Sequence, residues 1–315
     1  MRSSDTCFLG LDTSCYTTSI AAVSGGRVVM DERIMLDVAK GARGLRQSEA
    51  VFAHVRNLKA LFLSLEAEGI NIGGVAYSER PRPQSDSYMP VFTVGETMAV
   101  GCARALGVPF HALTHQHGHI YAAYLGNEIK DGAWCALHVS GGTLELLRVE
   151  IDGEIDDIET IGGTKDITAG QLIDRVGVAA GLPFPAGKHI EAMYRPGGAK
   201  LPVNVQGLCA NLSGAETQAM RMLESGEDKA KMLSGVIDCA AQTLAALVRN
   251  AAEAFDRFIF TGGVVCNEVI RNVLAEQCVA LGAQAVFAQK SYCGDNACGL
   301  ALAAEIRELK ENSIG

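Results

Sequence analysis

Four of the chain's seven histidines, His111, His115, His117 and His119, fall within nine consecutive residues. Imidazole is the commonest metal ligand among protein side chains, and it titrates near neutral pH. This density of histidines is the strongest chemical signal in the sequence, and it indicates metal binding.

The sequence around these histidines predicts a strand followed by a helix. We expect a strand over residues 108–113, with Thr114 as the N-cap of a helix over residues 115–125. On such a helix His115 and His119 lie about one turn apart and share one face.

The other two histidines fall outside this pair. His117 points to roughly the opposite side of the helix, and His111 lies back on the strand. The metal hypothesis therefore concerns His115 and His119; the alternative is that both are ordinary polar residues at a helix start. Two imidazoles do not make a site, so a third ligand must come from elsewhere in the chain.

The composition is that of a globular protein. At 315 residues the chain is long enough for two domains, and its 48 % hydrophobic and 20 % charged residues are typical of a large core. The net charge of −9 argues against a free-standing nucleic-acid binder. Binding to RNA would therefore need a local basic patch or a partner subunit.

The cysteines and the apolar segments predict a cytoplasmic protein without a membrane partner. The ten cysteines contain no C-x-x-C pair, which favours reduced, buried thiols over a disulfide framework or a zinc ribbon. The first residues are too polar for a signal peptide, and no apolar run approaches the roughly 20 residues that span a bilayer.

A strand–turn–strand–turn–strand pattern occurs twice, beginning at residues 8–12 and again at residues 135–139. Strand and helix signals alternate after each copy, which predicts an α/β fold of two similar lobes with a ligand between them. The polar stretch over residues 127–132 predicts their boundary. We expect an N-terminal lobe over residues 1–130 and a C-terminal lobe over residues 131–295, with a helix over about 296–315 packing back on the first lobe.

Three tight turns, each following an apolar strand, are suited to meeting phosphate. They are Asp12-Thr13-Ser14, Ser140-Gly141-Gly142 and residues 261–267. Glycines let backbone N–H groups approach an anion closely, and a helix N-terminus favours negative charge. Glycine pairs are also ordinary turn residues, so the indication rests on the position that all three turns share.

Motifs along nearly the whole chain resemble those of one family. They are residues 10–15 (G-I-E-T-S-C in the family), His115 and His119 (H-x-E-G-H), 139–142 (V-S-G-G), 169–175 (A-G-E-A-F-D-K), 185–191 (P-G-G-P-x-x-E), 262–267 (G-G-V-x-x-N) and 295–297 (D-N-A). The chain thus resembles the TsaD family of tRNA threonylcarbamoyl-adenosine synthases, formerly known as glycoproteases. The resemblance implies the actin-like ATPase (ASKHA) fold, with two ribonuclease-H-like lobes and a ligand cleft between them.

The resemblance also implies the third metal ligand, Asp295 of the D-N-A motif. A divalent ion, iron or zinc, suits two imidazoles and one carboxylate with open positions. Taken alone, Asp295 also fits an N-cap at a helix start.

A nucleotide-like ligand, an adenine nucleotide or an acyl-adenylate, is implied as well. The residues expected around it are Asp12, His138, Val139, Ser140, Gly141, Gly142, Asp174, Gly187, Glu191, Gly262, Gly263 and Asn267. The implied reaction transfers a threonylcarbamoyl group from its adenylate to N6 of the adenosine beside the tRNA anticodon, with the metal as Lewis acid and template. The implied partners are tRNA and the paralogous and ATPase proteins of the same system.

Several motifs depart from the family pattern, which predicts a divergent paralogue. His117 replaces the Glu of H-x-E-G-H, residues 79–86 replace the G-P-G-L loop, and the nearest match to S-F-S-G-L-K-T is residues 205–209. The alternatives are an ATPase or carbamoyl transferase of the same fold with another acceptor, or a non-catalytic subunit. A metalloprotease is disfavoured because the H-E-x-x-H general base is missing.

Two basic segments are candidates for anion or RNA contacts. Arg80-Pro81-Arg82-Pro83 is stiffened by its prolines and can hold two guanidiniums toward an anion. Residues 40–59, which include Arg43 and Arg46, carry five bases and one acid. The alternative for both segments is an ordinary solvated surface.

Overall fold

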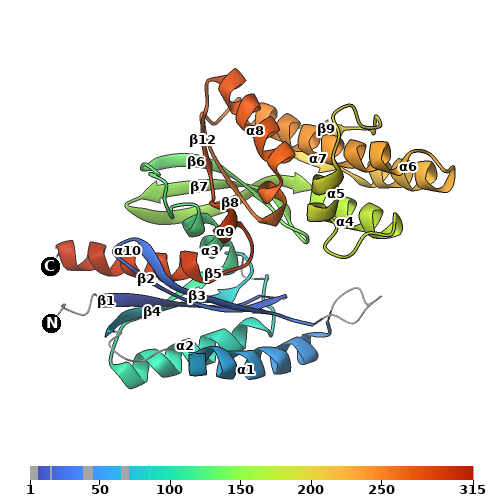
Figure 1. The fold of residues 1–315 in the computed structure, drawn as a ribbon. Helices are drawn as coiled ribbons and strands as arrows, with labels where there is room; N and C mark the ends of the chain where they lie inside the picture. Colours follow the sequence, from blue (N-terminus) through green and yellow to red (C-terminus); the bar gives the residue numbers. More distant parts are fainter. Residues whose placement is uncertain (1–5, 15, 38–44, 65–70, 85, 315) are drawn as a thin grey trace. The chain divides into compact units, whose positions relative to one another are not determined.

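The computed structural model describes residues 6–14, 16–37, 45–64, 71–84 and 86–314 (Figure 1). The chain divides into two compact units. Unit 1 comprises residues 1–131, 152–156 and 291–315, and unit 2 comprises residues 132–151 and 157–290.

Unit 1 contains a five-stranded sheet in the order β3-β2-β1-β4-β5. Its strands are β1 (Thr6–Thr13), β2 (Thr17–Ser24), β3 (Arg27–Met35), β4 (Asn71–Arg80) and β5 (Phe110–Thr114). The first three form an antiparallel meander, whereas β4 pairs in parallel with both β1 and β5. The strands β1 and β2 are buried on both faces, as expected for a sheet covered by helices on either side.

Helices cover both faces of this sheet (Figure 1). One face carries α1 (Gln47–Ser64) and α2 (Phe92–Leu106), and the other carries α3 (His115–Ala122) and α10 (Cys298–Ile314). Successive residues of β2 point to opposite sides, so Ile20 packs in the cluster under α1 and α2 while Ala21 packs in the cluster under α10.

Glycines allow α10 to approach its neighbours at backbone distance. A Cβ added to Gly10 of β1 would lie 2.2 Å from the carbonyl oxygen of Ala297, and one added to Gly299 would lie 1.9 Å from that of Gly118. A side chain at either position would force the elements apart. The contact between Gly118 and Gly299 therefore fixes the spacing of α3 and α10.

Unit 2 repeats the topology of unit 1, which confirms the predicted duplication. Its sheet has the order β12-β11-β6-β7-β8-β10-β9. The strands are β6 (Gly132–Val139), β7 (Leu144–Asp152), β8 (Glu154–Thr164), β9 (Asn204–Gln206), β10 (Cys209–Asn211), β11 (Arg257–Thr261) and β12 (Gln284–Phe287). The meander β6-β7-β8 followed by the parallel strands β11 and β12 matches β1-β2-β3 followed by β4 and β5.

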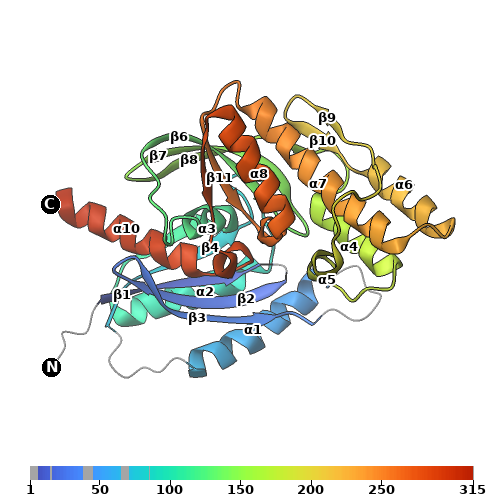
Figure 2. The ribbon, with the colours of Figure 1, turned by 45° about the horizontal axis from the view of Figure 1, so that its top comes forward.

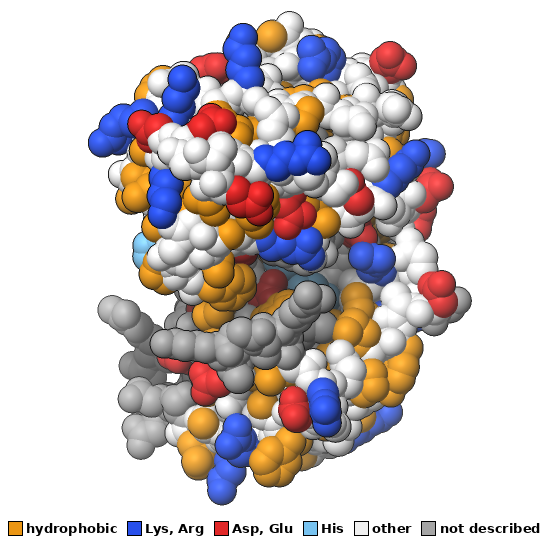
Figure 3. Space-filling view, turned by 90° about the vertical axis from the view of Figure 1, so that its right-hand side faces the viewer, with side chains coloured by type: hydrophobic (Ala, Val, Ile, Leu, Met, Phe, Trp, Pro, Cys, Tyr) orange, Lys and Arg blue, Asp and Glu red, His pale blue; other side chains and the backbone are white. Residues whose placement is uncertain are grey.

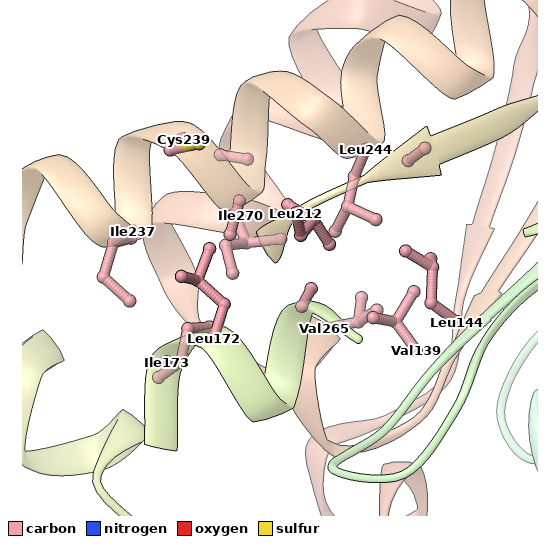
Figure 4. Packing of buried hydrophobic residues seen from close by; sticks show 14 of the residues in the cluster. Val139, Leu144, Leu172, Ile173, Leu212, Ile237, Cys239, Leu244, Val265 and Ile270 are labelled. Carbon is pink, nitrogen blue, oxygen red and sulfur yellow. The ribbon is translucent and has the colours of Figure 1, made fainter. Parts of the chain in front are cut away.

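The helices of unit 2 are α4 (Ala169–Ala179), α5 (Gly187–Met193), α6 (Ser213–Glu224), α7 (Lys229–Ala251) and α8 (Glu268–Leu281), with the short η1 (Gly263–Cys266) and α9 (Lys290–Cys293). Figure 2 shows α7 and α8 side by side. In the core, Val139 and Leu144 from the sheet pack in one buried cluster with Leu172, Leu244 and Ile270 from the helices (Figure 4).

The structure shows the state of the cysteines and the place of the most apolar helix. The nine cysteines that the structure describes are free thiols, and six of them are buried. In the described part of the chain, one helix, α7, is long and apolar enough to cross a membrane, but 78 % of its most apolar window is buried inside the protein. Burial in the core of unit 2 accounts for the apolar composition of α7.

A buried carboxylate ties α10 to the β2–β3 hairpin, and we expect its removal to destabilise unit 1. Glu305 is 5 % exposed and accepts the backbone N–H groups of Gly25 at 2.6 Å and Gly26 at 2.8 Å. Glu305→Ala leaves both donors without this acceptor and should lower the free energy of unfolding by about 1–3 kcal/mol, measured by urea denaturation. Glu311→Ala, at an exposed position of the same helix, is the control. Equal stability of the two variants would contradict this account.

Candidate functional site

The helix that carries the histidine pair begins with a capping box. Thr114 is the N-cap, as predicted: its Oγ1 accepts the N–H of His117 at 3.2 Å, and His117 Nδ1 accepts the N–H of Thr114 at 3.4 Å. Burial and the nearby Arg307 lower the pKa of His117 to about 4, so the ring stays neutral and can accept. His117 thus takes the position that Glu or Gln usually takes in a capping box, and it is not a spare metal ligand.

Three side chains converge at the first turns of α3. His115 Nε2 lies 3.1 Å from His119 Nε2 and 3.7 Å from Asp295 Oδ1, and His119 Nε2 lies 3.4 Å from the same oxygen. A tetrahedral ion with bonds of about 2.0–2.1 Å holds its ligand atoms about 3.3–3.4 Å apart. The three atoms are therefore spaced as the ligands of one metal ion.

Asp295 faces the histidines instead of capping α10, which resolves the alternative that the sequence left open. The helix begins at Cys298, and its N–H is accepted by Asn296 Oδ1 at 2.9 Å. The Asp295 carboxylate is left to accept the hydroxyl of Ser14 at 3.1 Å through Oδ2. The helix expected from about residue 296 begins two residues later, at Cys298, where Asn296 accepts the first N–H.

Asp12 lies behind His115 rather than at a ligand-binding surface. The carboxylate is fully buried; it accepts His115 Nδ1–H at 3.0 and 3.1 Å and also the hydroxyl of Ser78. With Nδ1 donating to Asp12, His115 presents Nε2 to His119 and Asp295. Such a carboxylate behind a histidine fixes the tautomer and orientation of the ring, which is the usual support of a metal-binding imidazole.

The charges of the cluster are strongly coupled. Burial lowers the pKa of His115, but Asp12 and Asp295 outweigh it and raise that pKa well above its ordinary value. Burial also lowers the pKa of His119, and this effect prevails although Asp295 opposes it. Burial raises the pKa of Asp295, yet hydrogen bonds from the two rings prevail and hold it well below its usual range. A cation bound at these atoms would replace the proton on His115.

His111 belongs to a separate contact. Its Nε2 lies 2.7 Å from Glu308 Oε1, so it joins the end of the sheet to α10. Of the four clustered histidines, two lie beside Asp295. His117 completes the capping box of α3, and His111 contacts Glu308.

In unit 2 the two turns that the sequence predicts to meet phosphate, at Ser140 and at Gly262, lie beside each other. The Ser140 turn closes on itself, since Ser140 Oγ accepts the N–H of Thr143 at 3.1 Å. Thr168, the N-cap of α4, donates its hydroxyl to the carbonyl of Gly141 at 2.8 Å. Gly262 has a φ of +98°, and a Cβ there would lie 2.3 Å from the carbonyl oxygen of Val139. The Ser140 turn, the start of α4 and the Gly262-Gly263 turn are therefore neighbours.

The polar residues predicted around a nucleotide also hold backbone groups of unit 2. Asp174 accepts the N–H of Ala186 at 2.8 Å, immediately before Gly187 and α5, and burial raises the pKa of this carboxyl. Glu191 accepts the N–H of Glu268 at 2.7 Å.

Asn267 is the N-cap of α8, since its Oδ1 accepts the N–H groups of Val269 and Ile270. His138 is buried on β6, where Thr261 and Glu145 are its partners on the neighbouring strands.

The two basic segments, residues 80–83 and residues 40–59, differ in the contacts that the structure shows for their arginines. The Arg80 guanidinium pairs with Glu79, and the carbonyl of Pro81 accepts the N–H of Gln116 on α3 at 3.1 Å. Arg46 is exposed at the start of α1, whereas Arg43 lies outside the described residues. Where side chains are coloured on the face in Figure 3, Lys and Arg lie among Asp and Glu rather than in one continuous patch.

The nearest sequence match to S-F-S-G-L-K-T, residues 205–209, stays a prediction, and a second match lies close to it in the chain. Residues 205–209 form the β9–β10 hairpin, whereas residues 211–217 share Ser213, Gly214 and Thr217 with the motif without a gap. The Asp166 carboxylate accepts the N–H of Ser213 at 3.0 Å and its hydroxyl at 2.6 Å. A cavity of about 400 Å³ adjoins this contact.

With this geometry in view, comparisons with known proteins identify the family. The family model described as tRNA N6-adenosine threonylcarbamoyltransferase, TsaD, matches residues 48–302. The chain belongs to the TsaD family. A tRNA N6-adenosine threonylcarbamoyltransferase of Pelobacter propionicus is 30 % identical over 314 residues, covering 93 % of this chain and 90 % of the relative. One of Thermus thermophilus is 30 % identical over 310 residues, covering 94 % and 91 %.

Solved structures confirm the ASKHA fold of this TsaD protein. Full-length HypF, in a phosphate- and nucleotide-bound form, has a TM-score of 0.57 at 13 % identity and is matched over 96 % of this chain and 55 % of its own. The activator of 2-hydroxyisocaproyl-CoA dehydratase from Clostridium difficile has a TM-score of 0.55 at 16 % identity. The match covers 98 % of this chain and 97 % of the activator. A ROK family glucokinase from Streptomyces griseus has a TM-score of 0.55 at 13 % identity. The match covers 96 % of this chain and 99 % of the glucokinase.

The Asp166 contact predicts a pH dependence of stability. Burial raises the pKa of Asp166, but hydrogen bonds from Ser213, Leu212 and Ile167 prevail and lower it to about 2. Because the folded pKa lies below the unfolded value of about 3.9, this group stabilises the fold above pH ~4, and the contribution is lost as the pH falls toward 2. Asp166→Asn should lower the urea midpoint at pH 7, and its difference from wild type should shrink between pH 4 and pH 2. Exposed Asp157→Asn is the control, and a difference independent of pH would contradict this account.

Proposed function

We propose that this protein transfers a threonylcarbamoyl group from threonylcarbamoyl-adenylate to N6 of the adenosine adjacent to the tRNA anticodon, using a divalent metal held by His115, His119 and Asp295. The observation that carries the proposal is the convergence of these three ligand atoms from segments far apart in the chain of a TsaD family member.

The donor set fits the proposed metal. Two imidazoles and one carboxylate leave open coordination positions and suit zinc or iron. Bound there, the ion would supply Lewis-acid polarisation of the donor's phosphate oxygens. Asp12 orients His115 for this role, and the hydroxyl of Ser14 holds the second oxygen of Asp295.

The glycine turns of unit 2 are proposed to bind the adenylate. Ser140-Gly141-Gly142 and Gly262-Gly263 offer backbone N–H groups to an anion, since no side chain blocks the approach of its oxygens. Asp174, Glu191 and Asn267 accept backbone N–H groups of the loop before α5 and of the start of α8, so these two segments beside the turns are held by the protein itself.

The acceptor and partners follow from charge as well as from family. A chain of net charge −9, with acidic and basic side chains interspersed on the face in Figure 3, offers little long-range attraction for RNA. We therefore propose that tRNA binding depends on paralogous and ATPase partner proteins in the cytoplasm.

A protease mechanism is not supported by the residues between the two histidines. They are Gln116, His117 and Gly118, and none is a carboxylate that could act as general base. His117 is engaged as the capping residue of the same helix.

Metal content and group transfer test the proposal together. His119→Ala should lose stoichiometric metal and should form no modified adenosine, because two ligands cannot hold the ion. His117→Ala is the matched control: it should keep the metal and lose about 1 kcal/mol of stability with the cap. Metal is measured by elemental analysis. Transfer is measured by mass spectrometry of unmodified tRNA incubated with threonylcarbamoyl-adenylate and the family's partner proteins.

Each contrary result has its own meaning. Wild-type protein without stoichiometric metal would indicate a non-catalytic subunit. Metal-loaded protein that leaves tRNA unmodified, with all partners present, would indicate another acceptor on the same fold.

A further inference from the structure

We propose that Arg80 and Arg82 recognise a carboxylate on the acyl unit of the donor, and so select acyl-adenylates that carry one. This inference rests on the proposed function and adds to it the determinant of donor specificity. It is argued from the loop over residues 79–83, all of which belongs to unit 1.

The loop is attached directly to the helix that carries the metal ligands. Arg80 lies opposite Thr114 in the pairing of β4 with β5. The carbonyl of Pro81 accepts the N–H of Gln116 at 3.1 Å, and Gln116 follows His115 in α3. The arginines therefore flank a residue whose backbone is bonded next to a ligand histidine.

A second contact ties the same strand to His115. Ser78, two residues before Arg80, donates its hydroxyl to Asp12, and Asp12 holds His115 Nδ1–H. Because the end of β4 is bonded both to Asp12 and to α3, its loop keeps a fixed position relative to the ligand atoms.

The guanidinium of Arg80 is oriented before any ligand arrives. Its Nε donates to Glu79 Oε1 at 2.8 Å and Nη2 contacts the same oxygen, while the two side chains are 32 % and 31 % exposed. Within the described residues, this leaves the Nη1 edge for another acceptor. A proline follows each arginine and restricts its backbone.

The turn that follows is also fixed. The hydroxyl of Ser87 lies 2.7 Å from the carbonyl oxygens of both Arg82 and Gln84. Arg82 itself is exposed. The loop is therefore a rigid support for two planar cations.

The planar guanidinium groups of the loop suit a carboxylate. A planar guanidinium pairs with a carboxylate through two parallel hydrogen bonds. Threonylcarbamoyl-adenylate has two anionic groups, a phosphate and the amino-acid carboxylate. The metal held by His115, His119 and Asp295 is proposed to act on the phosphate, so the carboxylate still needs a cation.

The same features argue against the RNA backbone as the ligand. Arg80 is half-buried and paired with Glu79, whereas phosphate contacts along an RNA need exposed cations over an extended surface. The G-P-G-L loop of the family pattern carries no charge, whereas residues 79–86, expected in its place, include Arg80 and Arg82.

Binding of paired donor analogues tests the inference. The probes are a non-reactive sulfamate analogue of threonylcarbamoyl-adenylate and the same molecule with its carboxylate converted to a methylamide. Calorimetry with metal-loaded, full-length wild type should show about tenfold or greater preference for the carboxylate form. Arg80→Gln/Arg82→Gln should lose this preference without weakening methylamide binding.

Two further variants control for charge and geometry. Arg27→Gln removes a cation from the first residue of β3, after the Gly25-Gly26 turn, and should keep the full preference. Arg80→Lys keeps the charge but not the paired donors, and should lose most of the contribution that Arg80 makes.

The outcomes separate this inference from the proposed function. An unchanged preference in Arg80→Gln/Arg82→Gln would overturn the inference and leave the donor site intact. Wild type that binds neither analogue would overturn the proposed function and the inference with it. A double variant that loses tRNA affinity but keeps its preference would assign the arginines to RNA, and would also overturn the inference.

Discussion

The close contact between α3 and α10 is the constraint on which the rest of the candidate site depends. The histidines lie on α3 and the aspartate immediately precedes α10, so the metal geometry is set by how near these two helices come. The missing side chain of Gly299 permits contact with the backbone of Gly118, and that of Gly10 lets the start of α10 approach β1. Packing of this kind tolerates almost no change in volume, which is why a site built on it can be held to a fraction of an ångström.

Electrostatics explains why the cluster needs its supporting residues. A buried carboxylate such as Asp12 is costly unless it is paired, and here it is stabilised by His115 and Ser78. Asp295 is stabilised in the same way by the two histidines and Ser14. Each of these charges therefore has a partner within the protein. The same logic applies to Arg80, which Glu79 orients in advance.

Local signals in the sequence predicted much of the fold, and contacts between distant residues account for what was missed. The Thr114 cap, the shared face of His115 and His119, and the repeated meander all follow from neighbouring residues. The roles of His117 and Asp12 do not, since both depend on which backbone or ring lies opposite in space. Asp166 is a similar case, because its partners at the start of α6 are nearly fifty positions away. The site was placed through family resemblance, which supplied Asp295 where spacing alone could not.

The central claim is that His115, His119 and Asp295 hold one metal ion. X-ray absorption spectroscopy of the metal-loaded protein tests it most directly, because imidazole rings give a distinctive multiple-scattering signature and sulfur ligands lie at a longer distance, about 2.3 Å for zinc. The account predicts two imidazoles and further oxygen ligands at about 2.0–2.2 Å in the wild type, and no stoichiometric metal with this first shell in His119→Ala. A first shell containing sulfur, or a spectrum unchanged in His119→Ala, would contradict it.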